Sequence, residues 1–327
     1  MRRRGVLGLG AAALGAGCAP YILPAGAPTV APSFSTEALL MPDGARLPLH
    51  AWLPEVPPRA AVIALHGFNE YSRSFAEDPA PLFTGAGIAL YAYDQRGFGR
   101  APHRGIWPGA ATLAADASTA AKLIRARHPD IPLVMMGESM GGAVLMVAAT
   151  AADPPPVDGY VLLAPAVWGR STMPVIMRWT LDLALALIPA IAFSNSAPGF
   201  APTNNLAALR RWSRDPLIIR ETRIDAVGGL VDLMDAAVAA APRFAAPALL
   251  LFGGDDRLVP SDSTRAMLRR LPPLSTQRVA FYQGGFHMLL RDRDGPKVVQ
   301  DIAAWVLDHG APLPSGADGA ARAWLTS

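Results

Sequence analysis

Cysteine is almost absent from this chain: Cys18 is the only one, so no internal disulfide can stabilise the fold. Charged residues are also scarce, at 17%, whereas 51% of the residues are hydrophobic, so something must cover large apolar surfaces. We find no internal repeat and no low-complexity domain. The 327 residues suit one large α/β domain with an insertion, or two small domains.

Basic residues outnumber acidic residues only slightly in this chain. Lys and Arg number 29 against 26 Asp and Glu, and three of the basic residues are Arg2, Arg3 and Arg4. No acidic residue precedes Glu37, so the chain beyond the first residues is nearly neutral. We see no basic patch interleaved with aromatic residues, which argues against a nucleic-acid partner.

Residues 1–18 read as an export signal. An arginine cluster precedes the apolar run Gly5–Gly17, which is too short to span a membrane as a helix. The run ends at Cys18 and resembles a bacterial lipobox, although Gly15 stands where leucine is usual. We therefore expect an exported lipoprotein anchored in a membrane through Cys18 and facing the periplasm or the cell exterior. The alternative is an ordinary leader, cleaved nearby, that releases a soluble periplasmic protein.

Short apolar segments alternate with helical segments over most of the chain. A turn at Pro42–Gly44 predicts a hairpin, and residues 19–36, rich in Pro, Ala and Ser, read as a tether. The alternation predicts an α/β fold with a mostly parallel sheet and helices on both faces. The expected strands are 61–65, 88–93, 133–136, 159–164, 248–252 and 277–282, and the expected helices are 110–127, 261–271 and 296–309.

The alternation is interrupted once, which predicts an insertion. Residues 37–165 and 246–310 form the expected core, and residues 311–327 form a tail. Residues 166–245 show no strand pattern and are expected to form a helical cap over the active site. The alternative is an insertion that serves packing alone. Within it, residues 172–193 are nearly all apolar and are expected to be buried or to touch lipid.

A candidate nucleophile lies between an apolar strand and a helix. Residues Gly137–Gly141 read Gly-Glu-Ser-Met-Gly, the G-x-S-x-G pattern of a nucleophile elbow. Such a turn holds Ser139 in a strained conformation at the carboxyl end of the sheet, and the glycines leave room for it. The alternative is a tight turn that uses small residues only for packing.

A serine hydroxyl needs a base, and in this chain order the base follows the serine. Only two histidines follow Ser139. His287 lies in a loop after the last expected strand, whereas His309 ends the last helix and is expected to cap it. The sequence therefore favours His287 as the base. His66 ends an earlier strand and is expected to make a structural hydrogen bond.

The acid that orients the histidine should follow the preceding strand. Asp255 and Asp256 both lie there, and spacing alone does not separate them. We favour Asp256 and expect Asp255 to be a solvated neighbour. Asp94 precedes the serine in the chain and is expected to organise its glycine-rich loop through Arg96.

Two backbone N–H groups are candidates for an oxyanion hole. Met140 opens the helix after the serine, where its N–H and the positive end of the helix favour negative charge. The second donor in this arrangement comes from the loop after the first parallel strand, which indicates the N–H of Phe68.

These pieces resemble the monoacylglycerol lipase and lysophospholipase branch of the α/β-hydrolase superfamily, also filed as serine aminopeptidase S33 domains. The resemblance spans residues 37 to about 309. In the family pattern the acid directly precedes an arginine, which supports Asp256. Glu138 departs from the usual histidine, and Phe68 from the usual alanine or serine. The matching segments are 66–70, 94–99, 137–142, 213–217, 253–257 and 284–287.

The resemblance implies a serine carboxylester hydrolase that acts through an acyl-enzyme on an acyl ester such as a monoacylglycerol or lysophospholipid. It implies no metal and no cofactor. The apolar cap residues Ile176, Met177 and Trp179 are predicted to bind the acyl chain, and a membrane surface is the expected partner. Two alternatives stay open: a peptidase or thioesterase with the same triad, and a lipid-binding protein that no longer turns over.

Overall fold

A nine-stranded sheet lies at the centre of the computed structural model, which describes residues 19–194 and 201–326. The strand order is β1-β2-β3-β5-β4-β6-β7-β10-β11, and the strands from β5 to β11 run parallel. The predicted mostly parallel sheet is thus confirmed. Its strands are β1 (Ser33–Phe34), β2 (Ala38–Leu40), β3 (Arg46–Trp52), β4 (Ala60–Leu65), β5 (Ile88–Tyr93), β6 (Leu133–Glu138), β7 (Gly159–Leu163), β10 (Ala248–Gly253) and β11 (Gln277–Tyr282).

The central strands are apolar because helices cover both of their faces. Every residue of β4, β5, β6 and β7 is buried. Their register also positions the site, because Leu65 at the end of β4 pairs with Gly137 near the end of β6. The loops that follow these two strands therefore begin side by side at one edge of the sheet.

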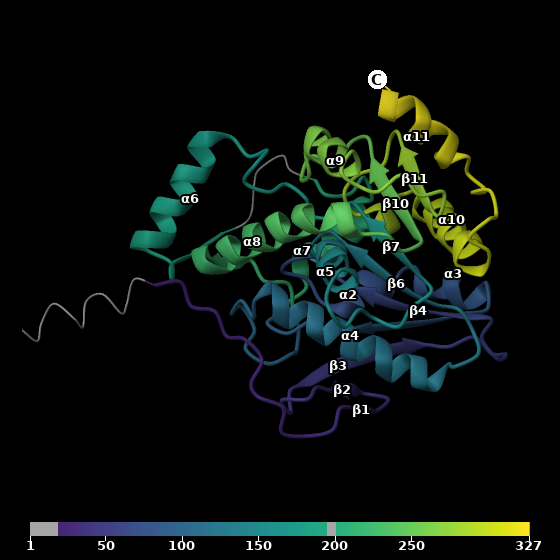
Figure 1. The fold of residues 1–327 in the computed structure, drawn as a ribbon, viewed down its shortest axis with the longest axis horizontal. Helices are drawn as coiled ribbons and strands as arrows, with labels where there is room; N and C mark the ends of the chain where they lie inside the picture. Colours follow the sequence, from purple (N-terminus) through teal and green to yellow (C-terminus); the bar gives the residue numbers. More distant parts are fainter. Residues whose placement is uncertain (1–18, 195–200, 327) are drawn as a thin grey trace, which may run out of the picture.

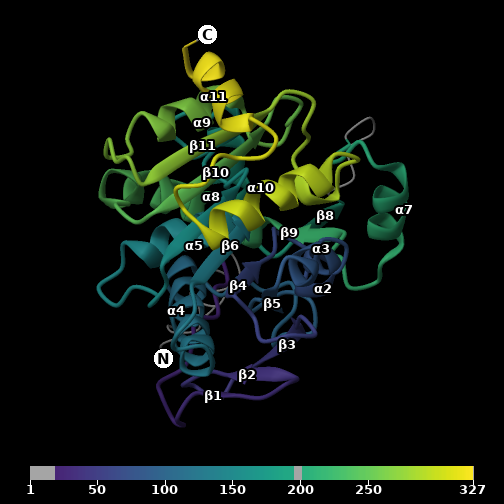
Figure 2. The same cartoon turned by 90° about the vertical axis from the view of Figure 1, so that its right-hand side faces the viewer.

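Two hydrophobic cores form, one on each face of the sheet (Figures 1 and 2). The first lies under α4 (Ala110–Arg127), α5 (Met140–Ala149), α8 (Ile224–Ala240) and α9 (Ser261–Leu268). The second lies under α2 (Ser72–Ala76), α3 (Ala80–Gly85) and α10 (Gly295–Leu307). The predicted helices in both halves of the core are present, with ends that differ by a few residues.

The insertion between β7 and β10 is mostly helical, but it also contains strands, which the sequence pattern did not indicate. Two short strands, β8 (Ala192–Ser194) and β9 (Glu221–Arg223), pair antiparallel. Three residues are too few for a periodic pattern, so the sequence carried no strand signal. The other elements are α6 (Val175–Leu187), α7 (Leu206–Arg214), α8 and the 3₁₀ turn η1 (Ala241–Arg243).

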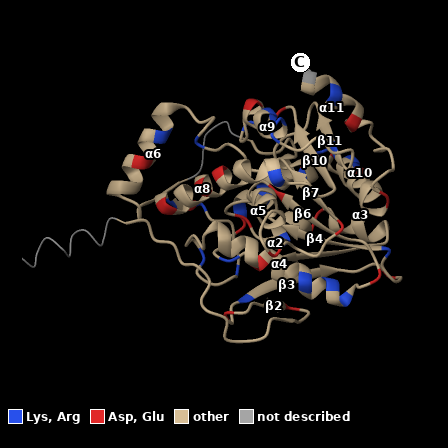
Figure 3. Ribbon diagram, viewed as in Figure 1, with Lys and Arg blue, Asp and Glu red and all other residues tan. Residues whose placement is uncertain are grey.

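Helix α6 is the exposed part of this insertion. It extends from the rest of the protein beside α8 in Figure 1, and none of its residues is buried. Its only charged residues are Arg178 and Asp182, and Figure 3 shows it almost free of charge colouring. Within the described residues, no helix combines the length and the hydropathy needed to cross a membrane.

The first and last described segments lie against the core. The predicted tether forms β1, and the Leu23 N–H donates to the Trp107 carbonyl at 2.9 Å. The predicted tail contains α11 (Ala317–Thr326), which covers the edge strand β11 in Figure 2. There the Trp324 ring stacks on Phe281 with ring centroids 4.7 Å apart. A single aromatic residue in the tail was too weak a sequence signal to predict this docking.

Candidate active site

Ser139 occupies a strained turn between β6 and α5. Its φ is 54° and its ψ is −115°, a backbone conformation that residues other than glycine rarely adopt. The turn is held by neighbouring backbone: the Ser139 N–H donates to the Leu163 carbonyl at 2.9 Å, and the Ala166 N–H donates to the Ser139 carbonyl at 2.9 Å. This geometry is that of a nucleophile elbow.

The glycines of the motif let the strand and the helix approach each other. A Cβ atom on Gly137 would lie 2.5 Å from the Gly141 carbonyl carbon, and one on Gly141 would lie 2.3 Å from the Leu65 carbonyl oxygen. Neither space admits a side chain, so the elbow depends on glycine at both positions.

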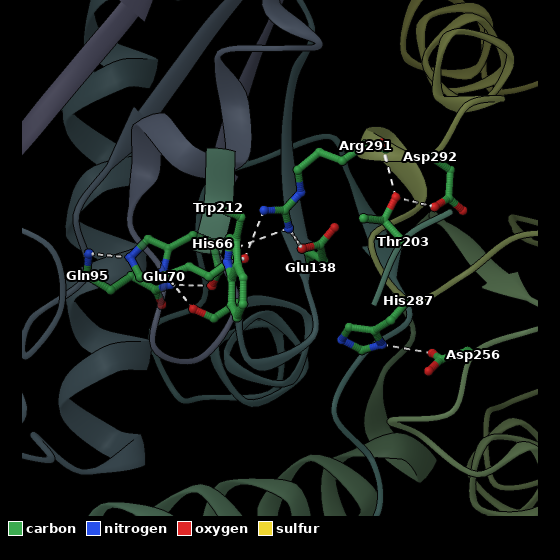
Figure 4. Close-up of polar contacts among 11 residues, drawn as sticks. His66, Glu70, Gln95, Glu138, Thr203, Trp212, Asp256, His287, Arg291 and Asp292 are labelled. Carbon is green, nitrogen blue, oxygen red and sulfur yellow. Dashed lines mark hydrogen bonds and ion pairs between the residues drawn. The ribbon is translucent and has the colours of Figure 1, made fainter. Parts of the chain in front are cut away.

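His287 and Asp256 come together at the carboxyl ends of β11 and β10. The Nδ1–H of His287 donates to Asp256 Oδ2 at 2.8 Å, and both side chains are buried (Figure 4). Asp256 Oδ1 also accepts the N–H groups of Leu258 and Val259, which fixes the carboxylate. With Nδ1 engaged, Nε2 is the ring nitrogen left to accept a proton.

The sequence did not decide whether Asp255 or Asp256 is the acid, and the structure puts the two residues in different surroundings. Asp256 contacts the imidazole, whereas the Asp255 side chain is exposed and its N–H donates to the Gly285 carbonyl at 2.8 Å. That backbone bond links the Asp256 loop to the His287 loop. His309 lies elsewhere, stacked on Trp305 with ring centroids 4.1 Å apart.

Within the described residues, the Ser139 hydroxyl makes no hydrogen bond with His287. Such bonds are often long in unliganded enzymes and shorten when substrate binds. The charge state of the imidazole is influenced by its surroundings: burial lowers the pKa of His287, but Asp256 and Glu138 raise it, and the net shift is upward.

The predicted oxyanion donors, Phe68 and Met140, belong to segments that lie next to Ser139. A Cβ atom on Gly67 would be 3.5 Å from the Ser139 Cβ, so the loop after β4 lies against the nucleophile. Met140 is the first residue of α5, where N–H groups have no partner inside the helix. The Phe68 N–H donates to no backbone carbonyl of the described residues. Both donors therefore remain available to a substrate oxygen.

His66 has the structural role expected of it. Its Nε2 accepts the Gln95 N–H at 3.0 Å, so the ring proton must lie on Nδ1, which donates to the Gly67 carbonyl at 2.8 Å. Complete burial lowers the pKa of His66, which keeps the ring neutral. The histidine thus holds the Phe68 loop and does not act as a base.

The expected pairing of Asp94 with Arg96 is wrong. Asp94 Oδ1 accepts the Ser72 N–H at 3.0 Å, and Oδ2 accepts the Arg100 N–H at 2.8 Å. Arg96 instead binds Asp43 and Asp116. The Ser72 hydroxyl also donates to Asp94, so backbone and hydroxyl donors satisfy this carboxylate without Arg96.

No role was predicted from the sequence for the residues that follow His287. Arg291, in the 3₁₀ turn η2 (Leu289–Arg291), binds Glu70 and Glu138 in the interior. Asp292 accepts the Phe286 N–H at 2.7 Å and so fixes the His287 loop. Their closeness to His287 in the chain was the only available signal.

Ile176, Met177 and Trp179 lie on α6 and are exposed to 69%, 44% and 69%. The structure describes no contact between them and the triad, so their predicted role in substrate binding stays a prediction. A small, mainly apolar cavity lies between the loop after β4 and the cap. Its lining residues include Phe68, Phe98, Trp107, Ile219 and Ala226.

A larger cavity of about 240 Å³ lies behind the His287 loop, between β11, α10 and α11, and no triad residue lines it. In the described part of the chain, no three His, Cys, Asp or Glu side chains are grouped to hold a metal ion. Cys18, the predicted lipidation site, lies outside the described residues.

The sheet order, the elbow and the buried histidine–aspartate pair define an α/β hydrolase. Residues 56–294 match the family described as serine aminopeptidase, S33, and the chain belongs to that family. The resemblance noted in the sequence is therefore confirmed.

Two relatives that match most of the chain are lipases by name. A monoacylglycerol lipase of Mycolicibacterium smegmatis is 26% identical over 81% of this chain and 94% of its own. The mouse monoglyceride lipase is 27% identical over 85% of this chain and 92% of its own.

Solved structures agree on the fold. A soluble variant of monoglyceride lipase from Saccharomyces cerevisiae superposes with a TM-score of 0.69 at 20% identity, over 89% of this chain and 98% of that chain. A carboxyl esterase from Bacillus coagulans gives a TM-score of 0.63 at 20% identity, over 86% and 98%. The α/β-hydrolase fold predicted from sequence is thus confirmed.

Proposed function

We propose that this protein is a serine carboxylester hydrolase that cleaves acyl esters of the monoacylglycerol or lysophospholipid type through an acyl-enzyme. The observation that carries the proposal is the buried hydrogen bond of 2.8 Å between His287 Nδ1 and Asp256, next to a serine in an elbow conformation. The names of the relatives, monoacylglycerol lipase and monoglyceride lipase, support the substrate class.

In the proposed mechanism, Ser139 Oγ attacks the ester carbonyl carbon and its proton passes to His287 Nε2. Asp256 stabilises the imidazolium ion that results. The N–H groups of Phe68 and Met140 stabilise the negative charge on the carbonyl oxygen. His287 then gives its proton to the leaving alcohol, and water repeats the cycle on the acyl-enzyme.

The apolar surface of α6 supports a lipid substrate. Large apolar side chains lie exposed there, including Ile176, Trp179 and Leu183, each at least 60% exposed. An exposed patch of large apolar side chains marks an interaction site. We propose that it contacts a membrane or an acyl chain, with Met177 as a further contact.

The test of the activity is a substrate panel of monoacylglycerols, lysophospholipids, short p-nitrophenyl esters, acyl thioesters and aminoacyl amides. For Ser139→Ala we expect kcat on the preferred ester to fall by about 10⁴-fold or more, because the triad acts as a unit. For Asp256→Asn we expect a loss of about 10⁴-fold, and for the matched neighbour Asp255→Asn a change within about twofold.

The other outcomes are equally clear. Near-normal hydrolysis by Ser139→Ala would mean that another group is the nucleophile. Cleavage of aminoacyl amides or thioesters but not of acylglycerols would assign a peptidase or a thioesterase. Stoichiometric binding of lipid without turnover by the wild type would indicate a lipid-binding protein.

We also propose that the protein is exported and held at a membrane by a lipid on Cys18, facing the periplasm or the cell exterior. The arginine-rich, apolar leader that ends at this cysteine supports the proposal. We expect wild type expressed in a bacterial host to fractionate with membranes and incorporate labelled palmitate, and Cys18→Ala to do neither. Equal solubility of the two proteins would favour a cleaved leader instead.

A further inference from the structure

A buried cluster of charged side chains, drawn in Figure 4, includes Glu138, the residue directly before Ser139. Arg291 donates to Glu70 Oε1 at 2.8 Å and to Glu70 Oε2 at 3.1 Å, and its Nη2 also donates to Glu138 Oε1. Trp212 of α7, in the cap, donates its indole N–H to Glu70 Oε1 at 2.6 Å. Three segments of the core and one of the cap therefore meet at these four side chains.

The cluster carries more negative than positive charge. Glu70, Glu138 and Arg291 have side chains only 2–3% exposed, so water screens their charges poorly. Two carboxylates share one guanidinium, which leaves a net charge of −1 when both are ionised. His66 does not offset this charge, because its hydrogen bonds and burial keep it neutral. His287 can carry positive charge and interacts with both carboxylates of the cluster.

The two glutamates are not equivalent. Both oxygens of Glu70 accept hydrogen bonds, one of them from Trp212 as well as from Arg291. Glu138 uses Oε1 for Arg291, whereas its Oε2 is buried and has no hydrogen-bond partner among the described residues. Glu138 also directly precedes Ser139, so its position relative to the nucleophile is fixed by the elbow.

We propose that Glu138 is a positioning residue of the hydrolase: its carboxylate, held by Arg291, stabilises the positively charged His287 that forms when Ser139 loses its proton. This inference rests on the proposed function for its catalytic consequence. Asp256 acts on the same imidazolium through the Nδ1–H, and Glu138 acts through space. No proton passes to Glu138 in this role; the proton moves from Ser139 Oγ to His287 Nε2.

The ionisation of Glu138 adds a dependence on pH. Burial and the neighbouring Glu70 raise the pKa of Glu138 to about 7, while Arg291 and His287 act to lower it. When Glu138 binds a proton, the net charge of the cluster changes from −1 to zero and its stabilisation of the imidazolium is lost. The acid limb of the pH–rate profile then belongs to two coupled groups, Glu138 and His287.

The test is Glu138→Gln, which keeps the shape and an oxygen acceptor for Arg291 but removes the charge. We expect the acid limb of kcat/KM to move to lower pH by about one unit, because His287 loses a stabilising negative charge. We also expect the kcat plateau at higher pH to fall by up to about tenfold, since the same lost interaction raises the barrier. A residue that only held the fold would lower kcat without moving the limb.

Two controls separate this role from packing. Glu138→Asp keeps the charge, and we expect it to retain most of the wild-type position of the limb. Glu70→Gln removes the other carboxylate, and because donors occupy both Glu70 oxygens we expect less than half the shift of Glu138→Gln. An equal shift in Glu70→Gln, or an unmoved limb in Glu138→Gln, would overturn the proposal.

A measurement without substrate keeps this inference distinct from the proposed function. The pKa of His287 can be followed by NMR of ¹³C-labelled histidine, assigned with His287→Gln. We expect the pKa to be lower in Glu138→Gln than in wild type by about one unit. If the wild type hydrolyses no ester but this shift is present, the proposed function fails and the electrostatic role of Glu138 stands. If esters are hydrolysed and no shift occurs, only the role of Glu138 fails.

Discussion

Two buried clusters in this protein each place one arginine between two carboxylates. Arg96 binds Asp43 at 2.7 Å and Asp116 at 2.9 Å. Arg291 binds Glu70 at 2.8 Å and also Glu138. All these side chains are less than 10% exposed, so the ingredients and the burial are nearly the same.

The difference lies in how the carboxylate oxygens are satisfied. In the first cluster Asp43 also accepts the N–H groups of Gly26 and Ala45, and both oxygens of Asp116 bind Arg96. In the second, Glu138 Oε2 has no hydrogen-bond partner within the described residues. In the Arg96 cluster, every carboxylate oxygen is bonded, and the cluster serves to hold the backbone. In the Arg291 cluster, Glu138 directly precedes the nucleophile and keeps an oxygen to which no described residue bonds, so its negative charge can act on the reaction.

The largest difference is expected when each arginine is removed. In Arg291→Met, two buried carboxylates lose their common partner, and we expect the free energy of unfolding to fall by about 3–5 kcal/mol. Arg96→Met should lose less, because backbone N–H groups still bind Asp43. Urea unfolding measures both losses of stability, and kcat per fluorophosphonate-reactive serine compares the activity of the two folded variants.

That kcat comparison sharpens the contrast. We expect folded Arg96→Met to keep kcat within about twofold of wild type, and Arg291→Met to lose about tenfold, since Glu138 is no longer held. Equal losses of kcat per folded site in the two variants would show that the clusters do not differ in function.

A smaller effect is expected in the pH dependence of stability. The pKa of Glu138 rises from its ordinary value of 4.5 to about 7 in the folded state. Between these values the folded protein keeps a proton that the unfolded chain has lost, so stability decreases as the pH rises through this range. Relative to Glu138→Gln, we expect the wild type to lose up to about 3 kcal/mol between pH 4.5 and 8.

The Arg96 cluster should show a smaller trend. Arg96 and backbone donors lower the pKa of Asp43, so its contribution changes only below its ordinary value of 3.8. Burial raises the pKa of Asp116, which gives a trend of the same sign as that of Glu138 but a smaller one. Urea unfolding of wild type, Glu138→Gln and Asp116→Asn across this range tests the contrast. A wild-type difference from Glu138→Gln that is constant with pH would contradict the raised pKa of Glu138.

Much of the fold was predictable because its signals are local. Runs such as 88–93 and 248–252 are apolar without alternation, which is what a strand covered on both faces requires. The G-x-S-x-G motif between a strand and a helix identified Ser139, and chain order restricted the base to His287 or His309. The structure brings His287 and Asp256 into contact, as the sequence led us to expect.

Other features had no local signal. The β8–β9 pair joins short segments about thirty residues apart, and α11 docks through contacts with β10 and β11. Asp94 found backbone donors at Ser72 and Arg100, which spacing along the chain did not reveal. Arg291 became part of the site only because η2 turns its side chain inward, toward the ends of β4 and β6.

The amino-acid order by itself determined which segments become strands and helices, and it placed a serine between two glycines where only an elbow fits. Those outcomes depend on neighbours within a few residues, through apolar periodicity and backbone sterics. The tertiary structure decided which of two aspartates meets the imidazole, and which carboxylates share an arginine. Such pairings depend on distances between segments far apart in the chain. They also depend on the loss of water on burial, because a buried charge without a partner costs free energy.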